Sequence, residues 1–199
     1  MTEAKPTIFI VDDDPSVRDS LELLVTSIGY DAKAYSSAHE FLECAPPGAP
    51  GCLILDIRMP GMSGLDLQER CIADGFFLPI IFITGHGTIP MSVRAMKAGA
   101  VDFLEKPFDE QEFLSAITKA IDRDRYETQA RDELREIVER VNSLSPREHE
   151  VFNLLVIGMS NKQVAGNLGT TERTIKAHRA SIMKKMNAKS LADLTRCAE

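Results

Sequence analysis

Short apolar runs alternate with amphipathic stretches over about the first 120 residues of the chain. Three runs are rich in β-branched residues and almost wholly apolar: residues 7–11 (TIFIV), 52–55 (CLIL) and 79–84 (PIIFIT). A parallel sheet that buries its strands on both faces produces this pattern. Residues 31–35 and 102–104 are weaker strand candidates. The alternation predicts an α/β doubly wound, five-stranded parallel sheet with helices on both faces.

The helices between these strands carry start and stop signals. Asp14 can cap a helix whose first residue is Pro15, and Gly29 ends it. Another helix is expected over residues 91–98, and a further one begins after a cap at Asp109.

The last 55 or so residues have a different pattern, with short helices separated by tight turns. Capping boxes are expected at residues 145–148 (SPRE) and 160–163 (SNKQ). A longer helix should run from about residue 171 to 186, and a fourth should start near Ser190. This pattern predicts a small all-helical module.

Residues 122–133 lie between the two parts and are strongly polar, after which an apolar stripe resumes at Leu134, Ile137, Val138 and Val141. A solvated helical linker explains this stretch, and we favour that interpretation. The alternative is a helix that pairs with its twin in a dimer, but two heptads are fewer than a coiled coil normally needs.

Composition is that of an ordinary globular protein, with 44% hydrophobic and 27% charged residues among 199. Net charge is −7, yet residues 161–199 hold 8 Lys and Arg against 3 Asp and Glu. A basic end on an acidic body indicates two parts with different partners. No apolar segment is long enough for a membrane span or signal core, so we expect a cytoplasmic protein without a membrane partner. Its four cysteines are expected to be reduced.

Polar side chains follow the carboxyl ends of the predicted strands, where open α/β sheets bind ligands. They are Asp12, Asp13, Asp14, Asp56, Thr84 and Lys106. Several carboxylates close together stay ionised only if a positive charge lies among them. That charge can come from Lys106 or from a hard divalent cation, of which Mg²⁺ suits oxygen ligands and phosphate best.

The longer C-terminal helix is amphipathic. At 100° per residue its apolar side chains Ile175, Ile182 and Met186 share one face, opposite a face with small and cationic side chains. The latter are Lys176, Ala177, Ala180 and Lys184. A capped helix and a short glycine-containing turn precede it, which is the helix-turn-helix pattern of DNA-binding proteins.

The motifs IFIVDDDPSVR, LILDIRMPGMSG, ITGHG and DFLEKPF resemble the receiver domain of two-component response regulators, over residues 5–122. The resemblance implies a flavodoxin-like sheet of order 2-1-3-4-5, with Asp56 as the phosphoacceptor. It further implies Mg²⁺ held by Asp13, Asp56 and the backbone carbonyl of Arg58, with Asp12 acting through a water. Lys106 and Thr84 would contact the phosphoryl group.

The same resemblance implies a switch. Thr84 would bond a phosphoryl oxygen and draw its loop inward, letting Phe103 turn toward the interior. Phe103 stands where the family often has Tyr. The bond between Lys106 and Pro107 should be cis.

Residues 144–194 resemble the LuxR-type helix-turn-helix domain. By that resemblance Lys176, Ala177 and Ala180 face the bases, while Arg179 and Lys184 meet phosphates. Gly166 departs from the long or basic residue that the family often has in the preceding helix.

Together the two matches resemble the NarL/FixJ class, with a receiver at 5–122, a helical linker at 123–142 and a DNA-binding domain at 143–199. They imply that the chain is a transcription factor and not an enzyme, and that a sensor histidine kinase phosphorylates it. Phosphorylation would favour a homodimer through residues 91–98, the fifth strand and the fifth helix. The dimer would bind double-stranded promoter DNA with recognition helices about 34 Å apart, and RNA polymerase is a further candidate partner.

Two other interpretations stay open at this point. Asp12 and Asp14 after an apolar strand resemble the nucleophile motif of haloacid-dehalogenase phosphatases, with Asp12 as nucleophile and Lys106 as the lysine of that family. In the second, a receiver controls a partner protein and the helical module does not bind DNA.

Overall fold

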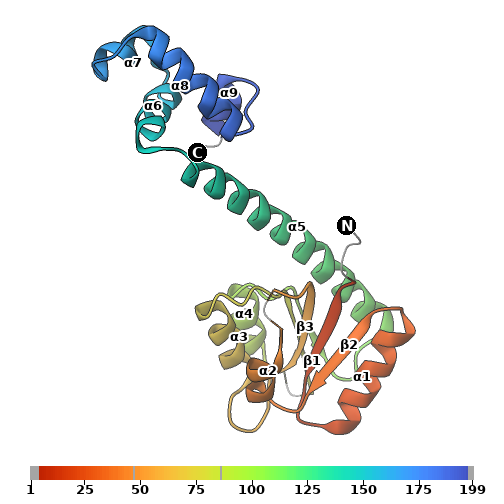
Figure 1. The fold of residues 1–199 in the computed structure, drawn as a ribbon. Coiled ribbons are helices and arrows are strands. Elements are labelled where there is room, and N and C mark those ends of the chain that lie inside the picture. Colours follow the sequence, from red (N-terminus) through yellow and green to blue (C-terminus); the bar gives the residue numbers. More distant parts are fainter. Residues whose placement is uncertain (1–4, 47, 86, 197–199) are drawn as a thin grey trace. The chain divides into compact units, whose positions relative to one another are not determined.

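The computed structural model describes residues 5–46, 48–85 and 87–196, so that His86 of the ITGHG motif and Cys197 lie outside the described residues. The chain divides into two compact units, Met1–Thr128 and Gln129–Glu199. In the first, five parallel strands form one sheet in the order β2-β1-β3-β4-β5. This confirms the predicted doubly wound sheet (Figure 1). The cysteines within the described residues are free.

The strands follow the apolar runs closely. They are β1 Thr7–Val11, β2 Asp31–Tyr35, β3 Gly51–Asp56, β4 Ile80–Thr84 and β5 Asp102–Glu105. The helices of this part are α1 Pro15–Ser27, α2 Ala38–Cys44, α3 Gly64–Ala73, α4 Ile89–Lys97 and α5 Glu110–Asn142. Every residue of β3 and β4 is buried, as the unbroken apolar runs predict for central parallel strands.

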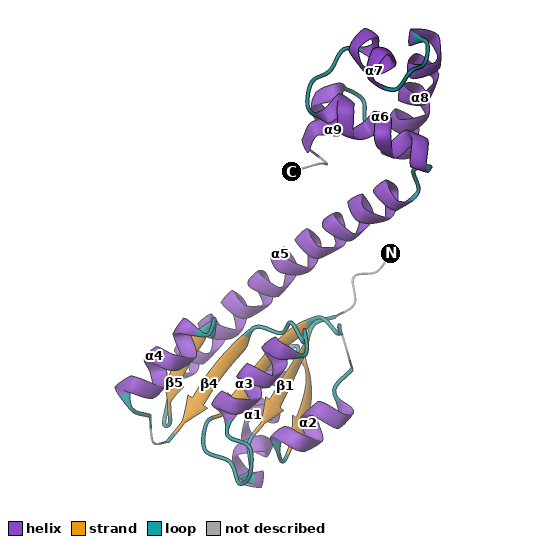
Figure 2. Cartoon of the chain, turned by 90° about the vertical axis from the view of Figure 1, so that its left-hand side faces the viewer, coloured by secondary structure: helices purple, strands orange, loops and turns teal. Residues whose placement is uncertain are grey.

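Each face of the sheet has its own apolar core. Helices α1 and α5 cover one face, where Ile10, Ile54 and Phe113 are buried together. Helices α2, α3 and α4 cover the other, where Phe41 and Leu67 pack against the strands. Figure 2 shows the strands running in parallel between these helices.

Two helices differ from the predicted bounds. Helix α4 begins at Ile89, two residues earlier than expected, because Pro90 lies in its first turn, where proline costs no hydrogen bond. Helix α5 continues without interruption to Asn142 through the polar stretch. Pairs four residues apart on the helix, such as Arg123 with Glu127 and Arg135 with Glu139, support this exposed helix.

The second unit contains the last turns of α5 and four short helices. These are α6 Pro146–Val156, α7 Asn161–Asn167, α8 Glu172–Lys185 and α9 Leu191–Arg196. Both predicted capping boxes are present, at Ser145 and Ser160. A separate core forms here, in which Val151, Ile175 and Ile182 are wholly buried. Among the described residues, no helix combines the length and the apolar character that crossing a membrane requires.

Gly166 lies near the end of α7, where a methyl group would meet no atom within 4 Å. We therefore expect Gly166→Ala to stabilise α7 by about 0.4–1 kcal/mol, because alanine loses less backbone entropy on folding than glycine. Slower hydrogen exchange of the amides of α7 would show this. In Gly64→Ala, by contrast, the new Cβ would lie 2.2 Å from the backbone oxygen of Asp56, so that variant should unfold more easily. Faster exchange in Gly166→Ala would contradict the prediction.

Candidate functional site

The register of the sheet brings the acidic residues together. Val11 of β1 pairs with Leu55 of β3, so Asp12 and Asp56 leave neighbouring strands at the same level. Asp56 in turn pairs with Ile83, which places Thr84 at the end of the next strand. Both carboxylates are almost covered: Asp12 is 1% exposed and Asp56 6%.

Lys106 lies between these two carboxylates. Its Nζ donates to Oδ2 of Asp12 at 2.6 Å and to Oδ1 of Asp56 at 3.0 Å. The residue follows β5, and its backbone N–H bonds to the carbonyl of Thr84 at 2.8 Å. Its bond to Pro107 is cis, as expected. The predicted convergence of Asp12, Asp56 and Lys106 on one edge of the sheet is therefore present.

Backbone amides hold the other carboxylate oxygens. The N–H of Arg58 donates to Oδ2 of Asp56 at 2.6 Å, and the N–H of Asp14 donates to Oδ1 of Asp12 at 2.9 Å. Arg18 of α1 also donates to the backbone carbonyl of Asp12, at 2.7 Å. This contact of Arg18 was not predicted from the sequence. The only feature that could have indicated it is the position of Arg18 in the first turn of the helix that follows the aspartates.

Asp13 and Asp14 are arranged differently from the buried pair. Asp14 caps α1, where its Oδ1 accepts from the amide and the hydroxyl of Ser16 at 2.8 and 2.6 Å. Asp13 is exposed and lines an open depression together with Arg58 and Met59. Asp13 thus borders the Asp12–Lys106–Asp56 cluster, whereas Asp14 serves the helix.

Burial and charge act in opposite directions on the titrating groups. Burial raises the pKa of Asp56, and the neighbouring charge of Asp12 adds to this, while hydrogen bonding to Lys106 opposes it. Burial disfavours the ammonium of Lys106, but its hydrogen bonds to Asp12 and Asp56 outweigh this and raise its pKa. One ammonium thus faces two buried carboxylates, and the exposed Asp13 adds a third negative charge nearby.

This excess of negative charge suits a divalent cation. Asp12, Asp13, Asp56 and the carbonyl of Arg58 offer only oxygen atoms, the ligands that Mg²⁺ prefers. Among the described residues, however, no three His, Cys, Asp or Glu side chains are grouped as a metal ion requires. The residues therefore fit Mg²⁺ through the chemistry of their donors and their charge, without a preformed cage.

Thr84 and Phe103 lie close to the same edge. Thr84 is 1% exposed, and the half-buried ring of Phe103 packs against Phe82 with 6.5 Å between ring centroids. A Cβ on Gly87 would lie 3.0 Å from the ring of Phe103 and 3.2 Å from the methyl group of Thr84. Gly87 therefore lets its loop lie against both side chains, a role that sequence reasoning did not assign.

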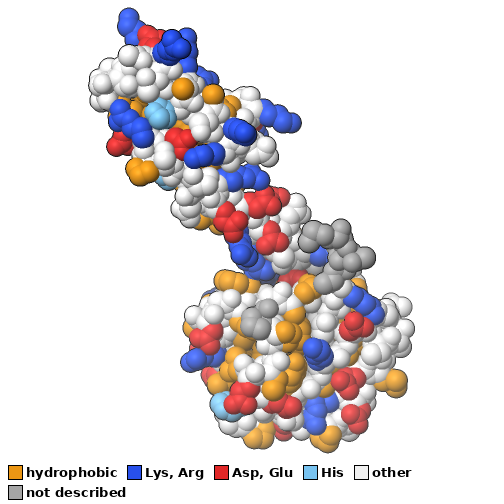
Figure 3. Space-filling model, viewed as in Figure 1, with side chains coloured by type: hydrophobic (Ala, Val, Ile, Leu, Met, Phe, Trp, Pro, Cys, Tyr) orange, Lys and Arg blue, Asp and Glu red, His pale blue; other side chains and the backbone are white. Residues whose placement is uncertain are grey.

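The second unit presents the predicted recognition helix, α8. Ile175, Ile182 and Met186 are at most 1% exposed and face the core. The side chains on the opposite face, Lys176, Ala177, Ala180 and Lys184, are exposed. Figure 3 shows Lys and Arg side chains gathered on this unit. Arg179 is half-buried, and its Nη1 lies 3.5 Å from Oδ1 of Asn161 at the start of α7.

The first turn of α6 holds the helix-turn-helix in position. The buried Glu148 accepts from Nζ of Lys185 and from Oγ of Ser181, both on α8 and both at 2.6 Å. Its neighbour Arg147 donates to the carbonyl of Leu168 at the end of α7, at 2.7 Å. The contacts of Glu148 with α8 were not predicted from the sequence, because the capping box at Ser145 already explains a glutamate at this position.

Comparison with known proteins finds a matching family for each of the two units. Residues 8–118 match the response regulator receiver domain, and residues 142–198 match the bacterial regulatory proteins of the LuxR family. Nodulation protein W of Bradyrhizobium diazoefficiens is 50% identical, covering 100% of this chain and 88% of that protein. The transcriptional regulatory protein FixJ of Azorhizobium caulinodans is 41% identical, covering 100% and 93%. The solved structure of the response regulator StyR has a TM-score of 0.89 at 49% identity, covering 98% of each chain.

Glu148 supplies a pH-dependent contribution to stability. Hydrogen bonds from Lys185, Ser181 and the amide of Ser145 lower its pKa from 4.5 to about 2. A lowered pKa means that the folded unit favours the ionised form, so the stabilisation is complete above pH 4.5 and disappears as the pH falls toward 2. We expect Glu148→Gln to lower the melting temperature at pH 7, with a smaller difference from the wild type at each step below pH 4.5.

Calorimetry of the full chain between pH 7 and the acid range below pH 4.5 measures the lower melting temperature of Glu148→Gln and its dependence on pH. Glu150→Gln is the matched control, because Glu150 lies on the same helix and pairs only at the surface, with Arg147. A pH-independent difference between Glu148→Gln and the wild type would contradict the assignment.

Proposed function

The chain belongs to the response regulators that join a receiver domain to a LuxR-type DNA-binding domain, and from that premise we propose that Asp56 is its phosphoacceptor. The observation that carries the proposal is the Lys106 ammonium, which bonds both Asp56 and Asp12 at the edge of the sheet. Phosphoryl transfer needs positioning and charge neutralisation more than covalent chemistry. A fixed ammonium beside a carboxylate supplies both.

In the proposed reaction, a carboxylate oxygen of Asp56 attacks the phosphorus of a phosphohistidine on a sensor histidine kinase. A P–O bond forms, the P–N bond breaks, and the imidazole nitrogen leaves with the electron pair. Lys106 and Thr84 then contact the phosphoryl oxygens. The chain is a transcription regulator and not a classical enzyme, and on this proposal it promotes only its own phosphorylation and dephosphorylation.

Asp13, Asp56 and the backbone carbonyl of Arg58 would hold Mg²⁺, and Asp12 would act through a water. When bound, the ion supplies positive charge that offsets the charge of the transferring phosphoryl group. The oxygen-only donors and the unbalanced carboxylate charge described above support this assignment.

Thr84 and Phe103 form the proposed switch. A phosphoryl group on Asp56 offers strong acceptors, and the Thr84 hydroxyl donates to one of them, which draws its loop inward and lets Phe103 turn toward the interior. The tight contact that a Cβ on Gly87 would make with both side chains supports a coupling between loop and ring.

The output of the switch is DNA binding. We assign residues 5–122 to the receiver, 123–142 to a linker and 143–199 to the DNA-binding domain. Phosphorylated receivers would pair through α4, β5 and α5, placing two recognition helices on successive major-groove turns of promoter DNA. Lys176, Ala177 and Ala180 would face bases, with Arg179 and Lys184 at phosphates. RNA polymerase is a further proposed partner.

The phosphatase interpretation is set aside by the family match, which covers both units. The LuxR match likewise decides against a helical module that does not bind DNA.

The phosphoacceptor can be tested with acetyl phosphate and Mg²⁺ as the phosphodonor mixture. We expect intact-mass spectrometry to detect one added phosphoryl group on the wild type and none on Asp56→Asn. Acetyl phosphate should also strengthen promoter binding by the wild type but not by Asp56→Asn. Asp19→Asn, which changes an exposed aspartate of α1, is the control and should behave as the wild type.

Peptide mapping distinguishes the alternatives. Modification of Asp12 in place of Asp56 would reinstate the phosphatase interpretation, and equal DNA binding by Asp56→Asn and by the phosphorylated wild type would exclude the switch.

A further inference from the structure

The cationic side chains of α8 fall into two groups. Lys185 is held by Glu148 and by the carbonyl of Ser143, and Arg179 contacts Asn161. Within the described residues, Arg173, Lys176 and Lys184 make no ion pair, and all three are exposed. These three are the cations of α8 that no contact within the described part of the unit holds in place, and Arg173 is the one that the resemblance to the LuxR family did not assign.

Arg173 lies at the centre of the exposed face. At 100° per residue, Ile182 lies on the opposite side of the helix from Arg173, and the buried Ile175 and Met186 lie within about 40° of that point. Ala177 and Ala180 fall within about 40° of Arg173 on its own side. The nearest carboxylate along the chain, Glu172, is turned about 100° away. The guanidinium thus projects from the face that carries the two small residues.

We propose that Arg173 is a specificity-determining residue, which reads a guanine in the major groove through both of its terminal nitrogens. The inference rests on the proposed binding of promoter DNA by α8. The N-terminal residues of a recognition helix contact base edges, and Arg173 is the second residue of this helix. The planar fork of arginine matches the O6 and N7 acceptors of guanine, the commonest specific contact in such complexes.

The neighbouring alanines favour base reading over a phosphate contact. Methyl side chains at Ala177 and Ala180 let the helix backbone approach the floor of the groove, and so bring an arginine on the same face to the base edges. Lys184 lies on the same face about three turns further along, in the last turn of α8, where a recognition helix would leave the groove. It therefore serves as the phosphate-contacting reference.

The test starts from a pool of duplexes of random sequence, from which the full chain treated with acetyl phosphate selects its preferred site. Fluorescence anisotropy then gives the Kd of wild type, Arg173→Ala, Arg173→Lys and Lys184→Ala. Each is measured on that site and on every single base-pair substitution of it, at several salt concentrations. Circular dichroism checks that each variant is folded.

We expect one G·C pair in each half-site whose replacement weakens wild-type binding about 5- to 150-fold. Arg173→Ala should lose this preference at that pair and keep the others, and Arg173→Lys should not restore it, since an ammonium lacks the fork. Lys184→Ala should weaken binding to all duplexes equally, with a salt slope smaller by about 1. If Arg173→Ala behaves like Lys184→Ala, Arg173 contacts a phosphate and the inference is wrong. If the wild type selects no sequence, the proposed DNA-binding function itself fails.

Discussion

One ammonium group between two buried carboxylates is the interaction on which the receiver depends. Asp12 follows β1 and Asp56 ends the neighbouring strand β3, so the pairing of these strands brings the two negative charges together. Lys106 provides the balance from the end of β5, through bonds of 2.6 and 3.0 Å. Removing one partner of a buried ion pair leaves a buried charge without a counter-charge. The loss of folding stability is then far larger than the stability that the intact pair contributes. The ion pairs of Lys106 therefore hold the end of β5 next to the ends of β1 and β3.

The second unit also contains a lysine–carboxylate pair, between Lys185 and Glu148. Here the pKa of the carboxylate is lowered, whereas that of Asp56 is raised. Glu148 accepts hydrogen bonds from a lysine, a serine hydroxyl and a backbone amide, and its pKa falls to about 2. Asp56 also accepts from a lysine and one amide, but burial raises its pKa and the neighbouring charge of Asp12 adds to the rise. The three hydrogen bonds of Glu148 favour its ionised form, whereas the ionised form of the buried Asp56 gains from additional positive charge. The difference in pKa direction separates Glu148 from the candidate reactive group.

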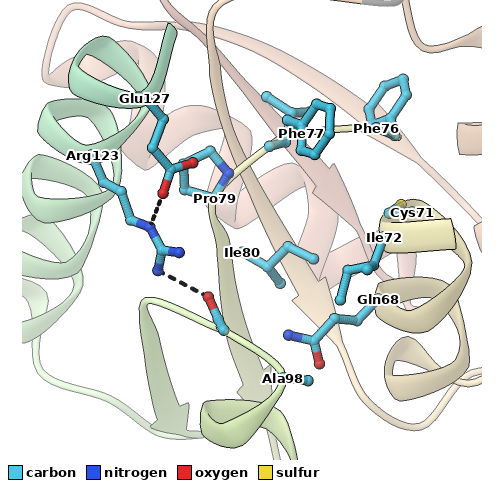
Figure 4. A pocket seen from close by; sticks show the side chains of 12 residues that line it. Gln68, Cys71, Ile72, Phe76, Phe77, Pro79, Ile80, Ala98, Arg123 and Glu127 are labelled. Atoms are coloured by element: carbon cyan, nitrogen blue, oxygen red, sulfur yellow. Dashed lines mark hydrogen bonds and ion pairs between the residues drawn. The ribbon is translucent and has the colours of Figure 1, made fainter. Parts of the chain in front are cut away.

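A hollow between α3, β4 and α5 shows how polar contacts also order the packing of the receiver. Gln68 and Arg123 line it, together with Cys71 and Phe76 (Figure 4). Gln68 is buried and donates to the carbonyl of Ala95 in α4, while Arg123 of α5 bonds the carbonyl of Gly99 and the carboxylate of Glu127. The bonds to Ala95 and Gly99 join the last turn of α4 and the residues just after it to α3 and α5, so the helix that carries much of the proposed dimer surface is held by both of its neighbours.

The amino-acid sequence by itself determined the two-part architecture and the central acidic cluster of this protein. Apolar runs, caps and glycines are local signals, and the carboxyl ends of parallel strands meet at one edge, so the convergence of Asp12, Asp56 and Lys106 followed from order along the chain. Other roles depended on tertiary contacts: the different surroundings of Lys184 and Lys185, and the hydrogen bond that joins Glu148 to Lys185 across 37 residues. The strands and helices themselves follow from periodicity. Which of two adjacent lysines meets a buried carboxylate depends on how the helices pack, because residues far apart in the chain must come together for that contact.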